Sequence, residues 1–204
     1  MNKENNQREK MVKRLREVLM VKRTDLPAEG DEWESLFRQC DTDLSVAFVQ
    51  RFTRDQNSGA EIHYCTNEEE IGAALKAIQS RYDGVPLLCG TDNLTNFAQF
   101  VGVENCRTAK SGSDEGIAAL LCEALTAWDG GIVVSDKQGL ENAASAIGER
   151  VVVLAFTSQV LPEWKEVSDR MTELYKELPD CVIMLEPGSV EHLHLILIED
   201  QIES

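Results

Sequence analysis

The chain has 204 residues, of which 43% are hydrophobic and 27% are charged. This composition is typical of a globular protein with a buried core and argues against a disordered chain. The formal net charge of −16 would repel a phosphate backbone, which argues against nucleic-acid binding. No apolar run approaches the roughly 18 residues that a membrane span needs. Residues 2–10 are polar where a signal peptide would turn apolar. We therefore expect a cytoplasmic protein with neither a membrane nor a nucleic-acid partner.

The first 23 residues form a basic segment. They carry eight Lys and Arg residues against three Glu, and Met11, Leu15 and Val18 recur at helical spacing. We predict a basic amphipathic helix at 1–23, a linker region at 24–44 with a polar stretch around Pro27 and Gly30, and a single α/β domain at 45–204. The helix could dock onto the acidic remainder, onto an acidic partner or onto a second copy in a homo-oligomer; a solvated helix face is the alternative.

From residue 45 on, helical and extended patterns alternate. Apolar residues at helical spacing predict helices, and short apolar runs predict strands. Thr66 or Asn67 can cap a helix whose first turn holds Glu68, Glu69 and Glu70. The expected helices span 45–54, 68–78, 93–101, 113–127, 140–147 and 161–178, and the expected strands span 61–65, 85–89, 131–135, 151–156, 181–185 and 193–198.

This alternation predicts the fold class. Continuous Val, Ile and Leu strands separated by amphipathic helices indicate an α/β fold with an open, mainly parallel sheet that is covered by helices on both faces. Residues 151–156 are apolar throughout, without polar alternation, so we place this strand in the centre of the sheet.

Motifs for specific chemistry are scarce. The sequence contains no glycine-rich dinucleotide or phosphate loop, no G-x-S-x-G and no H-E-x-x-H. The most suggestive segment is Asp129-Gly130-Gly131, because two glycines let a backbone approach a ligand and Asp129 could accept a hydrogen bond or act as a base. A tight turn is the alternative. Glu123 lies in an apolar stretch and could transfer protons if buried, or else point to solvent.

Three polar residues follow the apolar strand at 151–156: Thr157, Ser158 and Gln159. Ligands of open parallel sheets bind beyond the carboxyl ends of the strands, so these side chains are well placed to contact one. Capping of the next helix is the competing role. We therefore predict a ligand site that consists of Glu123, Asp129, Gly130, Gly131 and Gln159, with no catalytic residue assigned.

The sequence contains few patterns that indicate metal ligands. His192 and His194 flank Leu193, so on a strand they share one face and could share a metal ion, although neither Glu191 nor Glu199 is an assured third ligand. An ordinary polar strand face is the alternative. The six cysteines show no C-x-x-C spacing, which argues against an iron–sulfur cluster or structural zinc and favours buried, reduced thiols. We predict no metal and no cofactor.

Three stretches, in order, resemble the LutC/YkgG-type lactate-utilisation domain family, especially its shorter members. They are C-E-A-L-T-A-W-D-G-G-I-V-V-S at 122–135, V-V-V-L-A-F-T-S-Q-V-L-P at 151–162 and H-L-H-L-I-L-I-E-D at 192–200. The N-terminal segment, residues 48–54 and I-H-Y-C-T-N-E-E-E at 62–70 fit the same order. The resemblance implies a NagB/RpiA/CoA-transferase-like fold and a role in converting L-lactate to pyruvate, in which partner subunits carry the iron–sulfur clusters and the redox chemistry.

The chain departs from this family at its anion-binding motifs. Asp129-Gly130-Gly131 replaces a T-G-[ST] turn, residues 139–142 replace a G-R-R stretch, and residues 185–189 replace P-S-R-T-A-D-I-E and H-G-P. We expect a non-redox accessory subunit of an iron–sulfur lactate-utilisation complex. The alternatives are a small anionic metabolite-binding protein or enzyme of this fold, and a diverged, non-catalytic homodimer.

Overall fold

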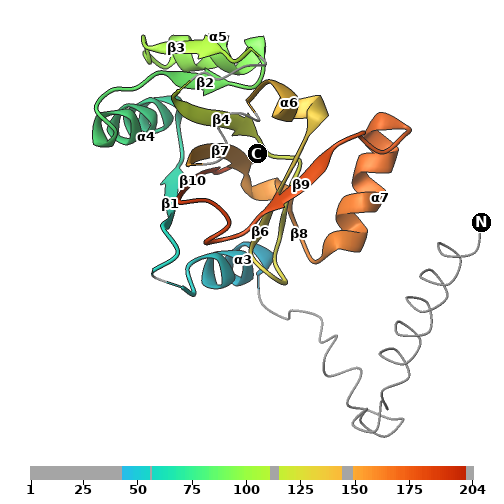
Figure 1. Ribbon diagram of the computed structural model, residues 1–204. Helices are drawn as coiled ribbons and strands as arrows, with labels where there is room; N and C mark the ends of the chain where they lie inside the picture. The colour runs from blue at the N-terminus through green and yellow to red at the C-terminus, as the bar shows by residue number, and fades with distance from the viewer. Residues whose placement is uncertain (1–42, 56, 111–114, 144–148, 201–204) are drawn as a thin grey trace, which may run out of the picture. The chain divides into compact units, whose positions relative to one another are not determined.

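Six parallel strands form the large sheet of the computed structural model, which describes residues 43–55, 57–110, 115–143 and 149–200 (Figure 1). Their order across the sheet is β1 (Ala60–Cys65), β10 (His192–Ile198), β7 (Arg150–Phe156), β4 (Ile117–Leu121), β2 (Leu87–Cys89) and β3 (Cys106–Thr108). β7 is therefore central, as its uninterrupted apolar sequence predicts. The prediction of an α/β fold with an open, mainly parallel sheet is confirmed.

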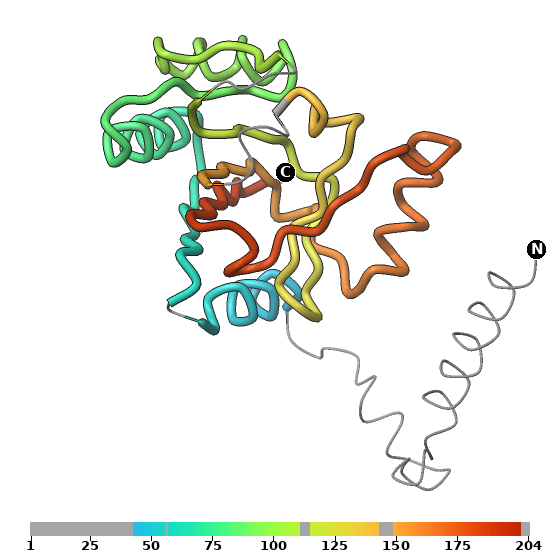
Figure 2. The backbone as a smooth tube through the Cα atoms, in the orientation of Figure 1, coloured from blue at the N-terminus to red at the C-terminus, as the bar shows by residue number. Residues whose placement is uncertain are grey.

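A smaller mixed sheet packs against the large one. Its order is β8 (Val160–Leu161), β5 (Ala124–Thr126), β6 (Gly131–Ser135) and β9 (Val182–Leu185), with β5–β6 and β6–β9 antiparallel and β5–β8 parallel. Figure 2 shows the chain leaving helix α7 (Trp164–Tyr175), passing through β9 and returning to the large sheet at β10. β9 folds back onto the β5–β6 hairpin and adds the fourth strand of the smaller sheet.

Both faces of the large sheet are covered. Helices α4 (Glu68–Arg81) and α5 (Asp92–Phe100) bury one face, where Leu75 and Ile78 pack with strand residues such as Val152. The other face packs against α3 (Leu44–Phe52), α6 (Leu140–Ala143) and the smaller sheet, and Phe48 and Phe52 are fully buried there. α7 packs against the outer side of the smaller sheet.

Helix α4 begins where the sequence predicts. The Asn67 side chain accepts a hydrogen bond from the Glu70 amide at 2.9 Å, and the Glu70 carboxylate accepts one from the Thr66 amide at 2.7 Å. This reciprocal arrangement satisfies backbone donors that a helix start leaves unpaired. The prediction of Asn67 as a cap is confirmed.

The helix predicted at 113–127 is wrong. Residues 117–121 form strand β4, buried between β7 and β2, and residues 124–126 form β5 of the smaller sheet. The spacing of Ile117, Leu120 and Leu121 matches a helical stripe, but a strand buried on both faces needs apolar residues at every position and contains the same spacing. Residues 113 and 114, where the predicted helix begins, lie outside the described residues.

Other boundaries shift by a few residues, and the short strands β3 and β8 were missed. The helix predicted at 161–178 is shorter, because Leu161 belongs to β8 and α7 begins at Trp164. β3 was not predicted, and its three residues are too few for a recognisable pattern. The predicted N-terminal helix at 1–23 and the linker up to residue 42 lie outside the described residues; Leu44 already belongs to α3. Among the described helices, none is long and apolar enough to cross a membrane.

Two glycines bring the end of β2 and the start of α6 into direct contact. Gly139 has φ +83°, and a Cβ at this position would lie 2.1 Å from the carbonyl oxygen of Gly90. The side-chain amide of Asn142 donates to the same oxygen at 2.9 Å. Since any side chain at Gly139 would overlap the Gly90 backbone, glycine is required by both conformation and space.

Candidate functional site

Adjacent positions on β1 and β10 bring a glutamate and two histidines together. Side chains alternate along a strand, so Glu61 and His63 share the face of β1 that α4 covers. In the parallel register, Glu61 lies opposite His194 of β10. The three side chains therefore converge on one point beside the sheet, although Glu61 and His194 are far apart in sequence.

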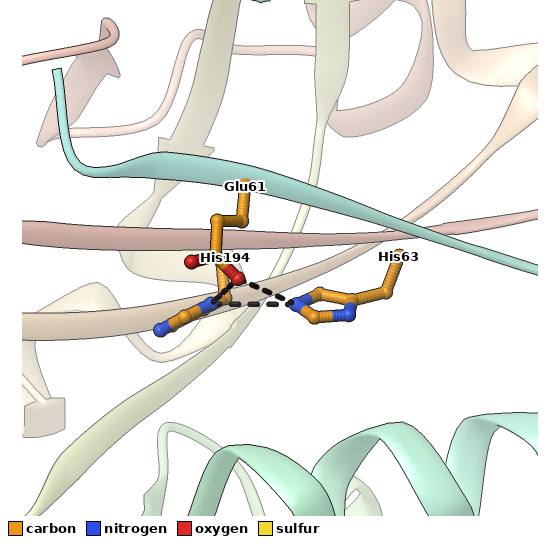
Figure 3. Close-up of side chains that lie close together, drawn as sticks. All are labelled: Glu61, His63 and His194. Atoms are coloured by element: carbon orange, nitrogen blue, oxygen red, sulfur yellow. Dashed lines mark hydrogen bonds and ion pairs between the residues drawn. The ribbon is translucent and has the colours of Figure 1, made fainter. Parts of the chain in front are cut away.

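The three side chains present their ligand atoms to one another (Figure 3). His63 Nε2 lies 3.3 Å from His194 Nδ1, and the Glu61 Oε2 atom lies 3.9 Å from His63 Nε2 and 3.8 Å from His194 Nδ1. Within the described residues, this is the one group of three or more His, Cys, Asp or Glu side chains whose ligand atoms could hold a metal ion.

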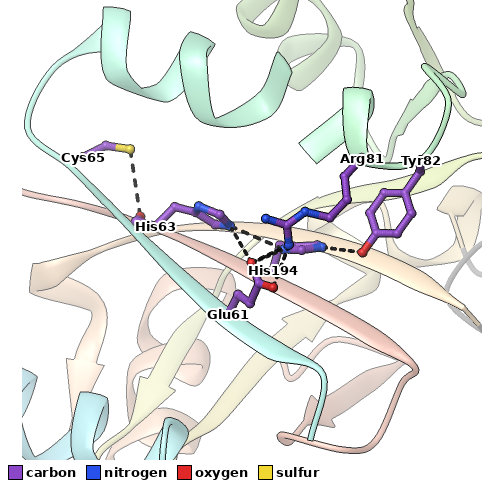
Figure 4. A network of polar contacts seen from close by, with 6 residues as sticks. All are labelled: Glu61, His63, Cys65, Arg81, Tyr82 and His194. Atoms are coloured by element: carbon purple, nitrogen blue, oxygen red, sulfur yellow. Dashed lines mark hydrogen bonds and ion pairs between the residues drawn. The ribbon is translucent and has the colours of Figure 1, made fainter. Parts of the chain in front are cut away.

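The end of α4 supplies the neighbours of this cluster (Figure 4). The Tyr82 hydroxyl pairs with His194 Nε2 at 2.8 Å, and Arg81 donates to both oxygens of Glu61 at 2.6 Å. The Arg150 guanidinium lies 5.2 Å from the centre of the Tyr82 ring. Glu61 and His194 are thus oriented by contacts to residues at the end of α4.

Burial sets the protonation of the two rings. The His194 side chain is 1% exposed and that of His63 is 22% exposed, whereas Glu61 is 46% exposed. Burial lowers the pKa of His194 to about 4 despite the opposing charge of Glu61, and it also lowers the pKa of His63. The hydrogen bond from Arg81 lowers the pKa of Glu61. At neutral pH the cluster therefore consists of two neutral imidazoles and one carboxylate.

Glu123 of the predicted site is buried. Its Oε1 accepts hydrogen bonds from the Ser135 hydroxyl at 2.5 Å and from the Tyr175 hydroxyl at 3.0 Å, which also lies 3.0 Å from Oε2. The solvent-facing alternative is therefore wrong. The carboxylate ties β6 to the end of α7, and its bonds to Ser135 and Tyr175 suit a structural link between the smaller sheet and its covering helix.

Asp129 and Gly130 lie in the β5–β6 hairpin turn, and Gly131 begins β6. The Asp129 Oδ1 atom accepts from the Gly131 amide at 2.9 Å and from the Thr126 hydroxyl. Gly130 has φ +79°, and a Cβ there would lie 2.7 Å from the Phe52 backbone nitrogen. The segment therefore has the geometry of a tight turn packed against the end of α3.

Replacing Asp129 with alanine is expected to lower the free energy of unfolding by about 1–2 kcal/mol, because two turn donors lose their acceptor. Asp129→Asn keeps one carbonyl oxygen in place and should lose less. Urea unfolding of both variants measures the difference. Unchanged stability in Asp129→Ala would contradict a turn role and return Asp129 to the list of ligand-binding candidates.

Gln159 lies near Glu123 but not near the hairpin turn. Its side-chain amide donates to the Cys122 carbonyl at 2.7 Å, and its oxygen accepts from the Phe156 amide at 2.7 Å. Glu123 and Gln159 therefore lie at one end of the β5–β6 hairpin, and Asp129, Gly130 and Gly131 form its tip. The structure does not bring the five predicted residues to one point.

The carboxyl ends of β1, β10 and β7 border an open groove of about 440 Å³. It is lined by the start of α4 and by the strand ends, namely Thr66, Asn67, Glu68, Glu69, Phe156, Ile198, Glu199 and Asp200. Asp200 is already an acceptor for the Ser158 amide at 2.6 Å and the Thr157 hydroxyl at 3.0 Å. The four carboxylates of this groove would repel an anionic metabolite.

The described cysteines are free thiols. Cys65, Cys89 and Cys122 are buried, Cys106 is half-buried, and Cys181 is exposed, unlike the expected buried state. Burial raises the pKa of Cys89 to about 11 and raises the pKa of Cys122 even further. These groups remain protonated at neutral pH, a form that binds metals poorly.

Sequence reasoning missed Glu61 and His63. The signal was present as the alternation E-I-H in a short predicted strand, matching the H-L-H pattern that contains His194. His192 and His194 do lie on the same face of a strand, as predicted, but the ring nearest to His194 Nδ1 belongs to His63 of the neighbouring strand. The proximity of His63 to His194 becomes visible only once β1 is known to pair with β10.

The fold and the site define a two-sheet α/β protein with a histidine-rich cluster beside an edge strand. The chain is similar to the crystal structure of a DUF162 family protein from Deinococcus radiodurans, with a TM-score of 0.57 and 14% sequence identity over 76% of this chain and 96% of that chain. At this identity, the similarity shows the fold alone. No family model matches the chain, and no curated protein matches it.

Proposed function

We propose that this chain is a diverged member of the LutC/YkgG-type lactate-utilisation family and acts as a non-redox accessory subunit for iron–sulfur partners that convert L-lactate to pyruvate. The observation that carries the proposal is the ordered series of three matching stretches. They fall on the β5–β6 hairpin, on β7 with the following β8, and on β10. The fold shared with a DUF162 family protein is compatible with this assignment.

The described thiols support the non-redox part of the proposal. An iron–sulfur cluster is held by thiolates that converge on it. Among the described cysteines, Cys65, Cys89 and Cys122 are instead buried and Cys106 is half-buried, and burial raises the pKa of all four. The partners would therefore supply the cluster ligands.

Exposed tryptophans give the accessory role a surface to test. The Trp128 amide donates to the Pro162 carbonyl at 3.0 Å, two residues before Trp164. The two tryptophans are 51% and 45% exposed. Tryptophan is enriched in the central contacts of protein interfaces, so a partner is expected to cover this pair.

A pull-down from the native host grown on lactate should recover iron–sulfur subunits with the tagged wild-type protein. The double variant Trp128→Ser/Trp164→Ser should lose them while keeping its circular dichroism spectrum. Phe100→Ser is the matched control, because Phe100 is 70% exposed on α5, away from the tryptophan pair. Recovery of the tagged protein alone would contradict a stable accessory role.

A further inference from the structure

We propose that Glu61, His63 and His194 form a binding site for one divalent transition-metal ion of the zinc class. The sequence alone predicts no metal, and the proposal comes from the pairing of β1 with β10. It is independent of the lactate-utilisation role, because it depends on the geometry of three side chains.

The distances fit a metal ion. The three ligand atoms form a triangle with sides of 3.3, 3.8 and 3.9 Å. The nearest point equidistant from all three lies in their plane, about 2.1 Å from each, which matches Zn–N and Zn–O bond lengths of about 2.0–2.2 Å. An ion there would replace the direct His63–His194 contact with one bond to each ring.

The donor set selects the class of metal. Two imidazoles and one carboxylate are ligands of open zinc sites and of related non-haem iron sites. Calcium and magnesium prefer sites made of oxygen atoms, and Cu(I) prefers sulfur, so this combination of ligands favours none of the three. The set contains three protein ligands, which leaves a fourth position for water or another small ligand.

The neighbours of the three side chains are those that a metal site needs. The Tyr82 hydroxyl, 2.8 Å from His194 Nε2, can accept from that nitrogen and leave Nδ1 to face the ion. Arg81 fixes the Glu61 carboxylate through hydrogen bonds of 2.6 Å. His194 is buried, whereas Glu61 is 46% exposed, so the ion and its fourth ligand would enter from the Glu61 side.

The test is metal titration of the full-length protein after chelator treatment and dialysis. Isothermal titration calorimetry with Zn²⁺ should show one ion per chain in the wild type. His63→Ala should weaken this binding by at least about 100-fold, since it removes one of three ligands. His192→Ala is the matched control: it removes the neighbouring histidine of the same β10 face, 39% exposed, and should leave affinity unchanged.

Cobalt distinguishes this site from a site made by cysteines. Co²⁺ bound to nitrogen and oxygen ligands gives visible d–d bands without sulfur-to-metal charge transfer, and His63→Ala should abolish them. If His63→Ala fails to fold, Glu61→Gln, at the more exposed position, replaces it and should abolish the same bands. The absence of one-to-one binding, equal affinity in the ligand variants, or a charge-transfer band from a thiolate would overturn the proposal.

Discussion

Replacing Gly139 with alanine is expected to lower the free energy of unfolding by at least about 3 kcal/mol. The left-handed conformation, with φ +83°, costs a residue with a side chain about 1–2 kcal/mol. The new Cβ would also lie 2.1 Å from the Gly90 carbonyl oxygen, so the backbone must move apart at a close-packed contact. Chemical denaturation followed by circular dichroism measures the loss.

The matched control is Gly84→Ala. Gly84 has a similar conformation, with φ +69°, but no atom lies within 4 Å of the position of its Cβ. The free energy of unfolding of this variant should therefore fall only by the cost of the left-handed backbone conformation, about 1 kcal/mol. Equal losses in the two variants would show that the Gly90–Gly139 contact relaxes easily, and would contradict a required close approach between β2 and α6.

The metal-free protein is expected to lose about 3 kcal/mol of stability through His194 as the pH falls from about 6.5 to about 4. The folded state lowers the pKa of this imidazole from 6.5 to about 4, so across this range the unfolded chain binds a proton that the folded protein does not. Stability therefore rises with pH across the window and is fully present above it. The lowered pKa of His63 adds a contribution of the same sign.

The expected dependence of the unfolding free energy on pH is set by all the charged or titratable groups around the His194 ring. These are Glu61 and His63 on β1, His192 on β10, Arg150 on β7, and Arg81 with Tyr82 at the end of α4. Urea unfolding between pH 4 and 7 in the presence of a chelator should show a shallower dependence for His194→Gln than for the wild type. Parallel curves for the two proteins would contradict the buried, neutral state of His194.

The sequence predicts the large sheet better than the small one. β7 consists of Val151, Val152, Val153, Leu154 and Ala155 between Arg150 and Phe156, and β-branched residues at successive positions fit a buried strand better than a helix. The β4 segment has alanines where β7 has valines, and alanine does not favour a strand over a helix. The spacing of its apolar residues therefore does not distinguish a strand from a helix. β9 pairs with the β5–β6 hairpin through long-range contacts that no local pattern reports.

The candidate site shows a similar division between local and long-range information. Alternation along each strand predicts that Glu61 and His63 share a face, and that His192 and His194 share one. The position of β10 beside β1, and a register that sets Glu61 opposite His194, follow from the path of the whole chain. Glu123 shows the same limit, because its partners Ser135 and Tyr175 come from two other elements.

β1 lies at the edge of the large sheet and hydrogen-bonds to β10 on one side only, in the part of the chain that the structure describes. Edge strands open locally at a lower free energy than central ones. An ion at the proposed site would hold Glu61 and His63 of this strand against His194 of its neighbour, and each opening of β1 would then require release of the ion. Fraying of the sheet and occupancy of the site would become a single linked equilibrium, so that amide hydrogen exchange along β1 reports on the metal without any assay of activity.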